Sequence, residues 1–143
     1  MSKPKLVMVG NGMAGVRTLE ELFRIAPDMY DVTIFGAEPH PNYNRILLSP
    51  VLAGEMKVQD IILNDHDWYR ENKVNLHLGK KVAKIDRVKR VVIGEDGTEA
   101  GIQTEGALED QHVSLLVAAT SHETDLVILH VGEVESFDMC SFR

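Results

Sequence analysis

The stretch Lys5-Leu-Val-Met-Val-Gly-Asn-Gly-Met-Ala-Gly15 decides the fold. Its apolar run from Leu6 to Val9 predicts a buried strand, and a G-x-G-x-x-G turn follows directly. A strand, this glycine spacing and a helix together indicate a dinucleotide-binding site. We expect a diphosphate to lie on the free N–H groups and the positive end of a helix that begins near Met13.

Each glycine of the turn has its own physical role. Gly10 permits the tight turn, Gly12 lets the backbone approach a diphosphate, and Gly15 lets the helix pack closely on the strand. The sequence therefore proposes one continuous set of cofactor-binding residues. These are Gly10, Asn11, Gly12, Met13, Ala14 and Gly15.

A helix and a second strand complete one βαβ unit. Apolar residues spaced for one buried face follow the glycines, and Pro27 ends the helix; they are Val16, Leu19, Leu22, Phe23 and Ala26. The β-branched and aromatic run 31–35 predicts the second parallel strand. Glu38 comes just after it, where a carboxylate can accept hydrogen bonds from an adenosine ribose and would repel a 2′-phosphate. The alternative is a polar loop residue, and the three glycines favour the ribose.

The loop 39–45 and the segment after residue 64 carry further candidates. Arg45 lies near the carboxyl ends of both strands, so it is either a partner for a phosphate or a surface arginine. We interpret His40 as an exposed loop residue rather than an acid or base, and Trp68 and Tyr69 as packing residues. His66 and its acidic neighbours are adjacent in a helix and do not face one another, so they predict no metal site.

Composition limits the classes of function. The 143 residues suffice for one domain, and 44% hydrophobic with 26% charged residues indicates a globular protein. No signal peptide or membrane span is expected, and the single Cys140 predicts a reducing cytoplasm. The net charge of −7 lies wholly within residues 101–143, which hold eight acidic residues and one basic residue. The acidic character of residues 101–143 argues against nucleic acid and anionic membrane as partners.

The remaining pattern predicts short strands and turns. Alternation over 74–78 indicates a half-exposed strand, and Glu95-Asp-Gly-Thr98 is a turn signal that follows the run 90–93. We expect an α/β fold of the doubly wound, Rossmann-like class, with a mostly parallel sheet and a β-hairpin or small meander near 78–105. The predicted domain spans residues 1–121, followed by an acidic tail at 122–143.

Residues 5–100 resemble the N-terminal FAD-binding region of the large subunit of assimilatory NAD(P)H-dependent nitrite reductases. These are flavoprotein reductases related to the pyridine nucleotide-disulfide oxidoreductases. The resemblance rests on five motifs, and the one around Arg45 is the most specific. They are Met8-Val-Gly-Asn-Gly-Met-Ala-Gly15, Phe35-Gly-Ala-Glu38, Pro41-Asn-Tyr-Asn-Arg-Ile-Leu-Leu-Ser-Pro50, Leu52-Ala-Gly-Glu55 and Leu78-Gly-Lys-Lys-Val82.

The resemblance implies FAD as cofactor and assigns roles to single residues. The glycine turn would hold the diphosphate and Glu38 the ribose, Arg45 would lie beside the cofactor, and the Val82 backbone would face the adenine. The family's closing strand ends in Ala-Thr-Gly. Here Leu115-Leu-Val-Ala-Ala-Thr-Ser121 places Thr120 correctly but has serine where glycine belongs.

The resemblance stops after residue 121, and several explanations stay open. The chain lacks the NAD(P)H domain, the siroheme region, the four cysteines of an iron–sulfur cluster and the C-x₄-C pair of disulfide reductases. Residues 101–143 could result from a shifted reading frame, a divergent closing segment, or a shorter module with its own partner. We expect an FAD-binding portion of a nitrite reductase-like enzyme, with no catalytic acid or base. The alternatives are a non-catalytic dinucleotide-binding module and an inactive fragment.

Overall fold

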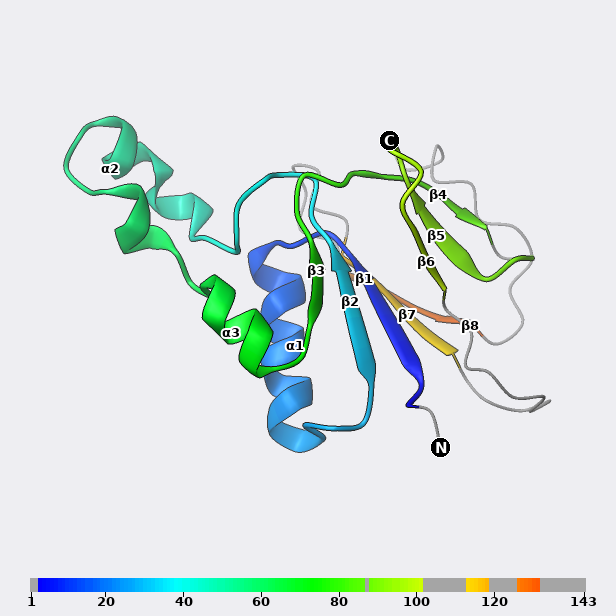
Figure 1. The fold of residues 1–143 in the computed structure, drawn as a ribbon. Coiled ribbons are helices and arrows are strands. Elements are labelled where there is room, and N and C mark those ends of the chain that lie inside the picture. Colours follow the sequence, from blue (N-terminus) through cyan, green and yellow to red (C-terminus); the bar gives the residue numbers. More distant parts are fainter. Residues whose placement is uncertain (1–2, 87, 102–112, 119–125, 132–143) are drawn as a thin grey trace.

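The computed structural model describes residues 3–86, 88–101, 113–118 and 126–131. Two sheets and a short set of helices make up this part of the chain (Figure 1). The strands are β1 Lys5–Val9, β2 Asp31–Phe35, β3 Asn75–His77, β4 Val82–Asp86, β5 Val91–Gly94, β6 Glu99–Gly101, β7 Val113–Ala118 and β8 Leu126–Val131. The α-helices are α1 Met13–Ile25, α2 Leu48–Leu52 and α3 His66–Glu71, and the 3₁₀ turns are η1 Arg45–Leu47 and η2 Val58–Ile61.

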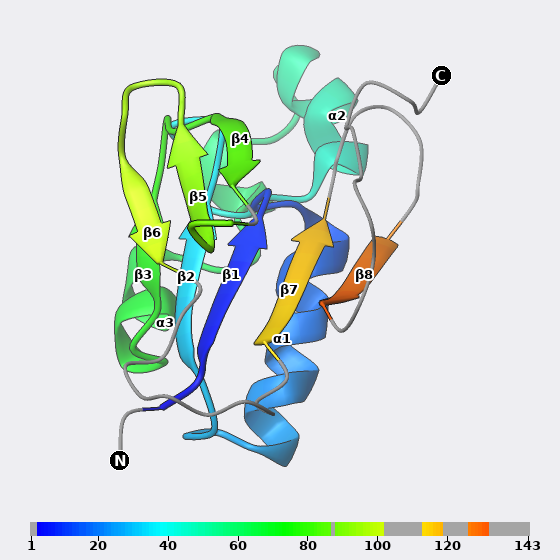
Figure 2. The same ribbon diagram turned by 90° about the vertical axis from the view of Figure 1, so that its right-hand side faces the viewer.

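The larger sheet has the strand order β3-β2-β1-β7-β8 (Figure 2). β1 lies parallel to both β2 and β7, and β2 lies parallel to β3. β8 closes this edge antiparallel to β7, with partners from Val113↔Val131 to Ala118↔Leu126. The predicted α/β class with a mostly parallel sheet is therefore confirmed, and part of the predicted tail pairs with this sheet.

Different elements cover the two faces of the larger sheet. α1 lies on one face, and the antiparallel meander β4-β5-β6 lies on the other (Figure 1). The meander confirms the prediction for residues 78–105, and its β5–β6 turn contains Gly97 at φ +85°. In the described part of the chain, a second β layer thus takes the place that a helix occupies in a fully doubly wound sheet.

β1 is buried on both faces, which explains its unbroken apolar run. Leu6 and Met8 point to the α1 side and join the larger hydrophobic cluster. Val7 packs on the other side with Phe35 of β2 and Val92 of β5. This arrangement fixes where β1 ends and therefore where the glycine turn begins.

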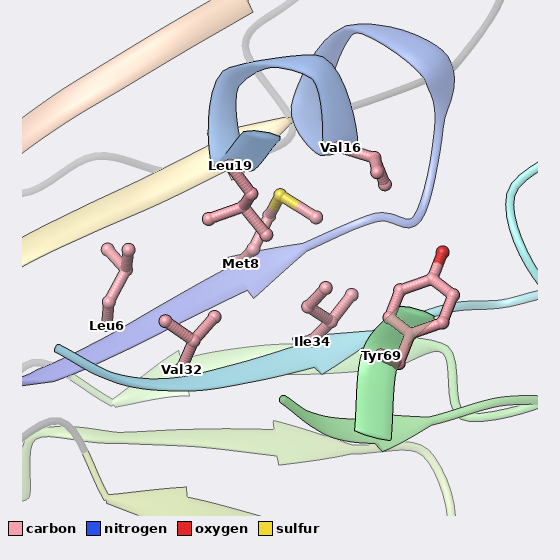
Figure 3. Packing of buried hydrophobic residues seen from close by; sticks show 7 residues of the cluster. All are labelled: Leu6, Met8, Val16, Leu19, Val32, Ile34 and Tyr69. Atoms are coloured by element: carbon pink, nitrogen blue, oxygen red, sulfur yellow. The ribbon is translucent and has the colours of Figure 1, made fainter. Parts of the chain in front are cut away.

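The larger cluster joins the sheet to α1 and α3 (Figure 3). Seven buried residues form it: Leu6, Met8, Val16, Leu19, Val32, Ile34 and Tyr69. Val16 and Leu19 come from the predicted apolar face of α1, and Leu22 and Phe23 pack at its margin. α3 begins after Asp65, whose side chain accepts a hydrogen bond from the Trp68 N–H at 2.9 Å, as expected for a helix cap.

The excursion between β2 and α3 has helical structure that the sequence did not predict. Residues 45–61 form η1, α2 and η2, and this excursion projects away from the sheet (Figure 1). Its apolar side chains at Ile46, Leu52 and Val58 are exposed. The surface positions of these apolar residues explain why hydrophobic periodicity gave no helical signal here.

Leu19→Ala tests the packing of α1 on the sheet. Leu19 is 0% exposed, so truncation leaves a cavity, and we expect the free energy of unfolding to fall by roughly 2–5 kcal/mol. Ile25→Ala, at the exposed end of the same helix, should change it by less than about 0.5 kcal/mol. Urea denaturation measures both. Equal losses would contradict the described burial.

Candidate functional site

The carboxyl ends of the first three strands meet at one end of the sheet. The Gly10 N–H donates to the carbonyl oxygen of Phe35 at 2.7 Å, which ties the turn after β1 to the end of β2. The Gly36 N–H donates to the carbonyl oxygen of His77 at 2.8 Å, which ties the turn after β2 to the end of β3. Ligands of open α/β sheets bind outside this edge.

The glycine turn leaves the first N–H groups of α1 without a side-chain cap. Gly10 has φ +102°, a conformation that favours glycine. Gly12 is the N-cap residue of α1, is buried, and makes no side-chain capping hydrogen bond. The N-terminal N–H groups of a helix need partners, and the helix dipole favours an anion there. This end of α1 therefore suits a phosphate group.

A cavity of about 340 Å³ opens in front of the glycine turn. Three segments line it: the turn after β1, the turn after β2, and the loop that follows. The lining residues are Gly10, Asn11, Gly12, Gly36, Ala37, Glu38, His40, Pro41, Asn42, Tyr43 and Arg45. One end of the cavity therefore lies at the N-terminus of α1, which suits an anion, and the other end lies at the Glu38 carboxylate.

Three side chains meet at the Glu38 end of the cavity. Glu38 and Arg45 are predicted site residues, and Tyr43 is not. The Tyr43 hydroxyl donates to Glu38 Oε2 at 2.8 Å, and the Arg45 guanidinium pairs with Glu38 Oε1 at 2.5 Å. The guanidinium carbon of Arg45 also lies 5.5 Å from the centroid of the Tyr43 ring. Burial, followed by the hydrogen bond to Glu38, raises the pKa of Tyr43. The phenol is therefore a donor at neutral pH.

A buried polar network holds the loop 39–45 against the glycine turn. The Tyr69 hydroxyl accepts from the Asn42 N–H at 3.2 Å and donates to Asn11 Oδ1 at 2.8 Å. Asn42 Nδ2 donates to Asn64 Oδ1, and Asn64 Nδ2 donates to Glu20 Oε1, each at 2.8 Å. Since the Glu20 carboxylate can only accept, it fixes the orientation of both amides along the chain.

Two atoms of this network have no hydrogen-bond partner in the described part of the chain. They are Asn11 Nδ2, a donor, and Asn42 Oδ1, an acceptor, and both are buried. Burial of an unpaired polar group costs about 1–3 kcal/mol. Both residues line the cavity, so the uncompensated atoms belong to the walls of the candidate site.

The structure brings together most of the sequence-predicted site. Gly10, Asn11, Gly12, Glu38 and Arg45 line the one cavity. Met13, Ala14 and Gly15 form the first turn of α1 behind it. Val82 opens β4, where the register shifts between Val82 and Lys84, and it is not part of the cavity wall. Thr120 lies outside the described residues.

Sequence reasoning missed the residues that support the cavity wall. His40 is exposed, as expected, and Tyr69 is a core residue, as expected, but its hydroxyl also reaches Asn11. Tyr43, Asn42 and Asn64 were not predicted to be site residues. Hydrophobic periodicity cannot indicate that Asn42 and Asn64 are buried. In the sequence, only the motif around Arg45 indicated that the loop 39–45 contributes to the site.

The comparisons with known proteins agree on one family. The model of the pyridine nucleotide-disulphide oxidoreductases matches residues 4–138, which is most of the chain. The chain belongs to this family. This match confirms the family resemblance that the sequence indicated over residues 5–100. The family model extends further, to residue 138.

Curated relatives of the chain include two from Bacillus subtilis. The chain is 57% identical over 93 residues to a nitrite reductase [NAD(P)H] and 50% identical over 93 residues to an assimilatory nitrate reductase electron transfer subunit. Each alignment covers 65% of this chain and 12% of the relative. The chain therefore spans about an eighth of the length of these relatives.

Solved structures share the fold. NADH:rubredoxin oxidoreductase from Clostridium acetobutylicum superimposes with a TM-score of 0.67 at 20% identity, covering 95% of this chain and 32% of that one. The putidaredoxin reductase–putidaredoxin complex gives a TM-score of 0.66 at 24% identity, covering 82% and 26%. None of the helices in the described ranges has the length and apolar character that crossing a bilayer requires.

The family and its flavoprotein reductases imply FAD as cofactor, and the residues present fit its diphosphate. The N-terminus of α1 lacks a side-chain cap, and the buried Gly12 presents backbone without a side chain. Asn11 adds a buried amide donor that has no partner within the described residues. A donor set of N–H groups suits phosphate oxygens, which only accept.

Tyr69→Phe tests the network that joins the loop to the glycine turn. The substitution leaves the Asn42 N–H and Asn11 Oδ1 without their shared partner, so we expect the free energy of unfolding to fall by roughly 1–3 kcal/mol. Tyr30→Phe is the matched control, because Tyr30 packs against the same cluster and its hydroxyl bonds to no described residue. Urea denaturation of both variants measures the difference, and equal stabilities would argue against the network.

Proposed function

We propose that this chain is the FAD-binding portion of an NAD(P)H-dependent, nitrite reductase-like flavoprotein that passes electrons onward. The observation that carries the proposal is the uncapped start of α1 behind Gly12, which faces the same cavity as Glu38. The names of the two Bacillus subtilis relatives support the reaction class, since both are reductase components of nitrogen oxyanion metabolism. The single cysteine is consistent with the cytoplasm as its compartment.

In this proposal each segment of the cavity holds one part of FAD. N–H groups of the segment Gly10, Asn11, Gly12, Met13, Ala14 and Gly15 hold the diphosphate. Glu38 accepts hydrogen bonds from the adenosine ribose, with Arg45 beside it, and the Val82 backbone faces the adenine. Thr120, which lies outside the described residues, is the remaining cofactor contact in this proposal. The isoalloxazine, when bound, supplies the redox chemistry, and the protein supplies binding and electrostatics.

The other parts of a nitrite reductase belong to further domains or subunits in this proposal. The sequence has one G-x-G-x-x-G turn and one cysteine. Other domains or subunits would therefore have to supply the nicotinamide site and the four-cysteine cluster. The presence of only one such turn favours a second candidate function, a dinucleotide-binding module without turnover. An inactive fragment that binds nothing is the third.

Two measurements separate these candidates. Visible flavin absorbance of the purified protein, or saturable FAD binding, would exclude the fragment that binds nothing. NADH oxidation with an artificial electron acceptor then separates a reductase portion from a module. Turnover supports the reductase, whereas FAD binding without turnover supports the module. Failure to bind FAD at all would contradict the proposal.

Gly12→Val tests close approach of the diphosphate. Gly12 has φ −91° and ψ 173°, which any residue can adopt, so the variant adds a side chain without backbone strain. We expect FAD affinity to fall at least tenfold, measured by flavin fluorescence titration, while the fold is retained. Gly101→Val is the matched control, because among the described residues a Cβ there would meet the flexible end of Lys5, at an ordinary contact distance of 3.9 Å. Equal FAD affinities in the two variants would show that the glycine turn does not bind FAD.

A further inference from the structure

We propose that Tyr43 is a positioning residue that holds the Glu38 carboxylate for a ribose diol. By doing so it determines whether the site distinguishes ribose from 2′-deoxyribose. This inference rests on the proposed function, because it takes Glu38 as the ribose contact. Tyr43 itself need not touch the ligand in order to have this effect.

The backbone of Glu38 is held in place by the loop after β3. The Gly79 N–H donates to the Glu38 carbonyl oxygen at 3.0 Å. The Lys80 N–H donates to the Gly36 carbonyl oxygen at 2.8 Å. The turn after β2 is therefore tied to the turn after β3, and the remaining freedom of Glu38 is in its side chain.

The backbone around Tyr43 is held independently, by a different segment of the chain. Tyr43 forms an isolated antiparallel bridge with Ile62, and the Asn44 N–H donates to the Ile61 carbonyl oxygen at 2.8 Å. The neighbouring Asn42 is buried and receives support from the Tyr69 hydroxyl. Tyr43 thus extends from a fixed backbone position toward Glu38.

The hydrogen bond from Tyr43 fixes one oxygen of the carboxylate. A carboxylate only accepts, so the phenol must donate its proton to Glu38 Oε2, at 2.8 Å. Burial raises the pKa of Tyr43, with a further contribution from the Glu38 hydrogen bond, so the phenol keeps that proton at neutral pH. The direction of the bond is therefore constant over the pH range in which the protein would work.

Arg45 occupies the other oxygen but is the weaker constraint. Its contact with Glu38 Oε1 is an ion pair between side chains that are 42% and 43% exposed. Exposed ion pairs contribute little and are screened by salt. The Tyr43 contact is partly buried, so it is the more persistent of the two.

Two acceptor positions on Glu38 stay available for a ligand. A carboxylate has about four lone-pair sites, and the two protein donors use one on each oxygen. The vicinal 2′- and 3′-hydroxyls of a ribose offer two donors side by side. A carboxylate that is already oriented loses less conformational entropy when it binds such a diol.

The test compares binding of ADP and 2′-deoxyADP by calorimetry to the full chain. Wild-type protein should prefer ADP, because the 2′-hydroxyl completes the contact with Glu38. Tyr43→Phe keeps the ring beside Arg45 and removes only the hydroxyl. We expect it to weaken ADP binding by roughly tenfold and to leave 2′-deoxyADP nearly unchanged, so that the preference disappears.

Two controls separate positioning from structural damage and from failure of the proposed function. Tyr30→Phe should leave the ADP to 2′-deoxyADP ratio at its wild-type value, and Glu38→Gln should abolish the preference. In wild-type protein the ratio should also persist at high salt, which screens the Arg45 pair but not the Tyr43 contact. This last measurement needs no variant and is independent of any folding defect.

Each outcome decides the question. A preference that Glu38→Gln abolishes and Tyr43→Phe preserves would overturn the positioning role and leave the proposed function intact. A preference that vanishes at high salt in wild-type protein would assign the positioning to Arg45 and overturn the inference. Equal binding of ADP and 2′-deoxyADP by wild-type protein would show that Glu38 does not contact the 2′-hydroxyl of the ribose. That result would overturn the inference. Absence of ADP binding in protein that binds FAD would overturn the inference alone, whereas absence of both ADP and FAD binding would refute the proposed function itself.

Discussion

Burial of β1 on both faces is the constraint on which the rest of the structure depends. Leu6 and Met8 are held by α1, and Val7 is held by the meander through Phe35 and Val92. A strand fixed from two sides ends at a defined point, and Gly10 is the first residue beyond it. The backbone donors at the start of α1 are therefore placed chiefly by hydrophobic packing.

The loop after β2 completes the cavity because polar contacts hold it there. Its backbone is tied to residues 61–64, and its buried Asn42 is joined to the glycine turn through the Tyr69 hydroxyl. Tyr69 is also a core residue on α3 (Figure 3). One side chain thus couples hydrophobic packing to the geometry of the candidate site. This coupling explains how a loop that begins with the exposed Pro39 and His40 can keep a fixed position.

Local signals made part of this structure predictable. The strand, glycine turn and helix of residues 5–25 follow from period and spacing alone, and so does β2. The partnership of Glu38 with Tyr43 and Arg45 was not predictable, because it depends on where the chain returns after residue 61. The excursion 45–61 gave no signal, since its apolar residues Ile46, Leu52 and Val58 are exposed. β8 lies within a segment interpreted as an unmatched tail, although its apolar run indicated a strand.

The central claim is that the N–H groups at the start of α1 bind the diphosphate of FAD. Backbone ¹H–¹⁵N NMR spectra of the full chain, recorded during titration with FAD, test it most directly. The account predicts that the largest saturable shifts occur at Asn11, Gly12, Met13 and Ala14, with smaller ones at Glu38, and that strands β5 and β6 of the meander change least. Saturable binding with unchanged resonances from Gly10 to Gly15 would contradict it.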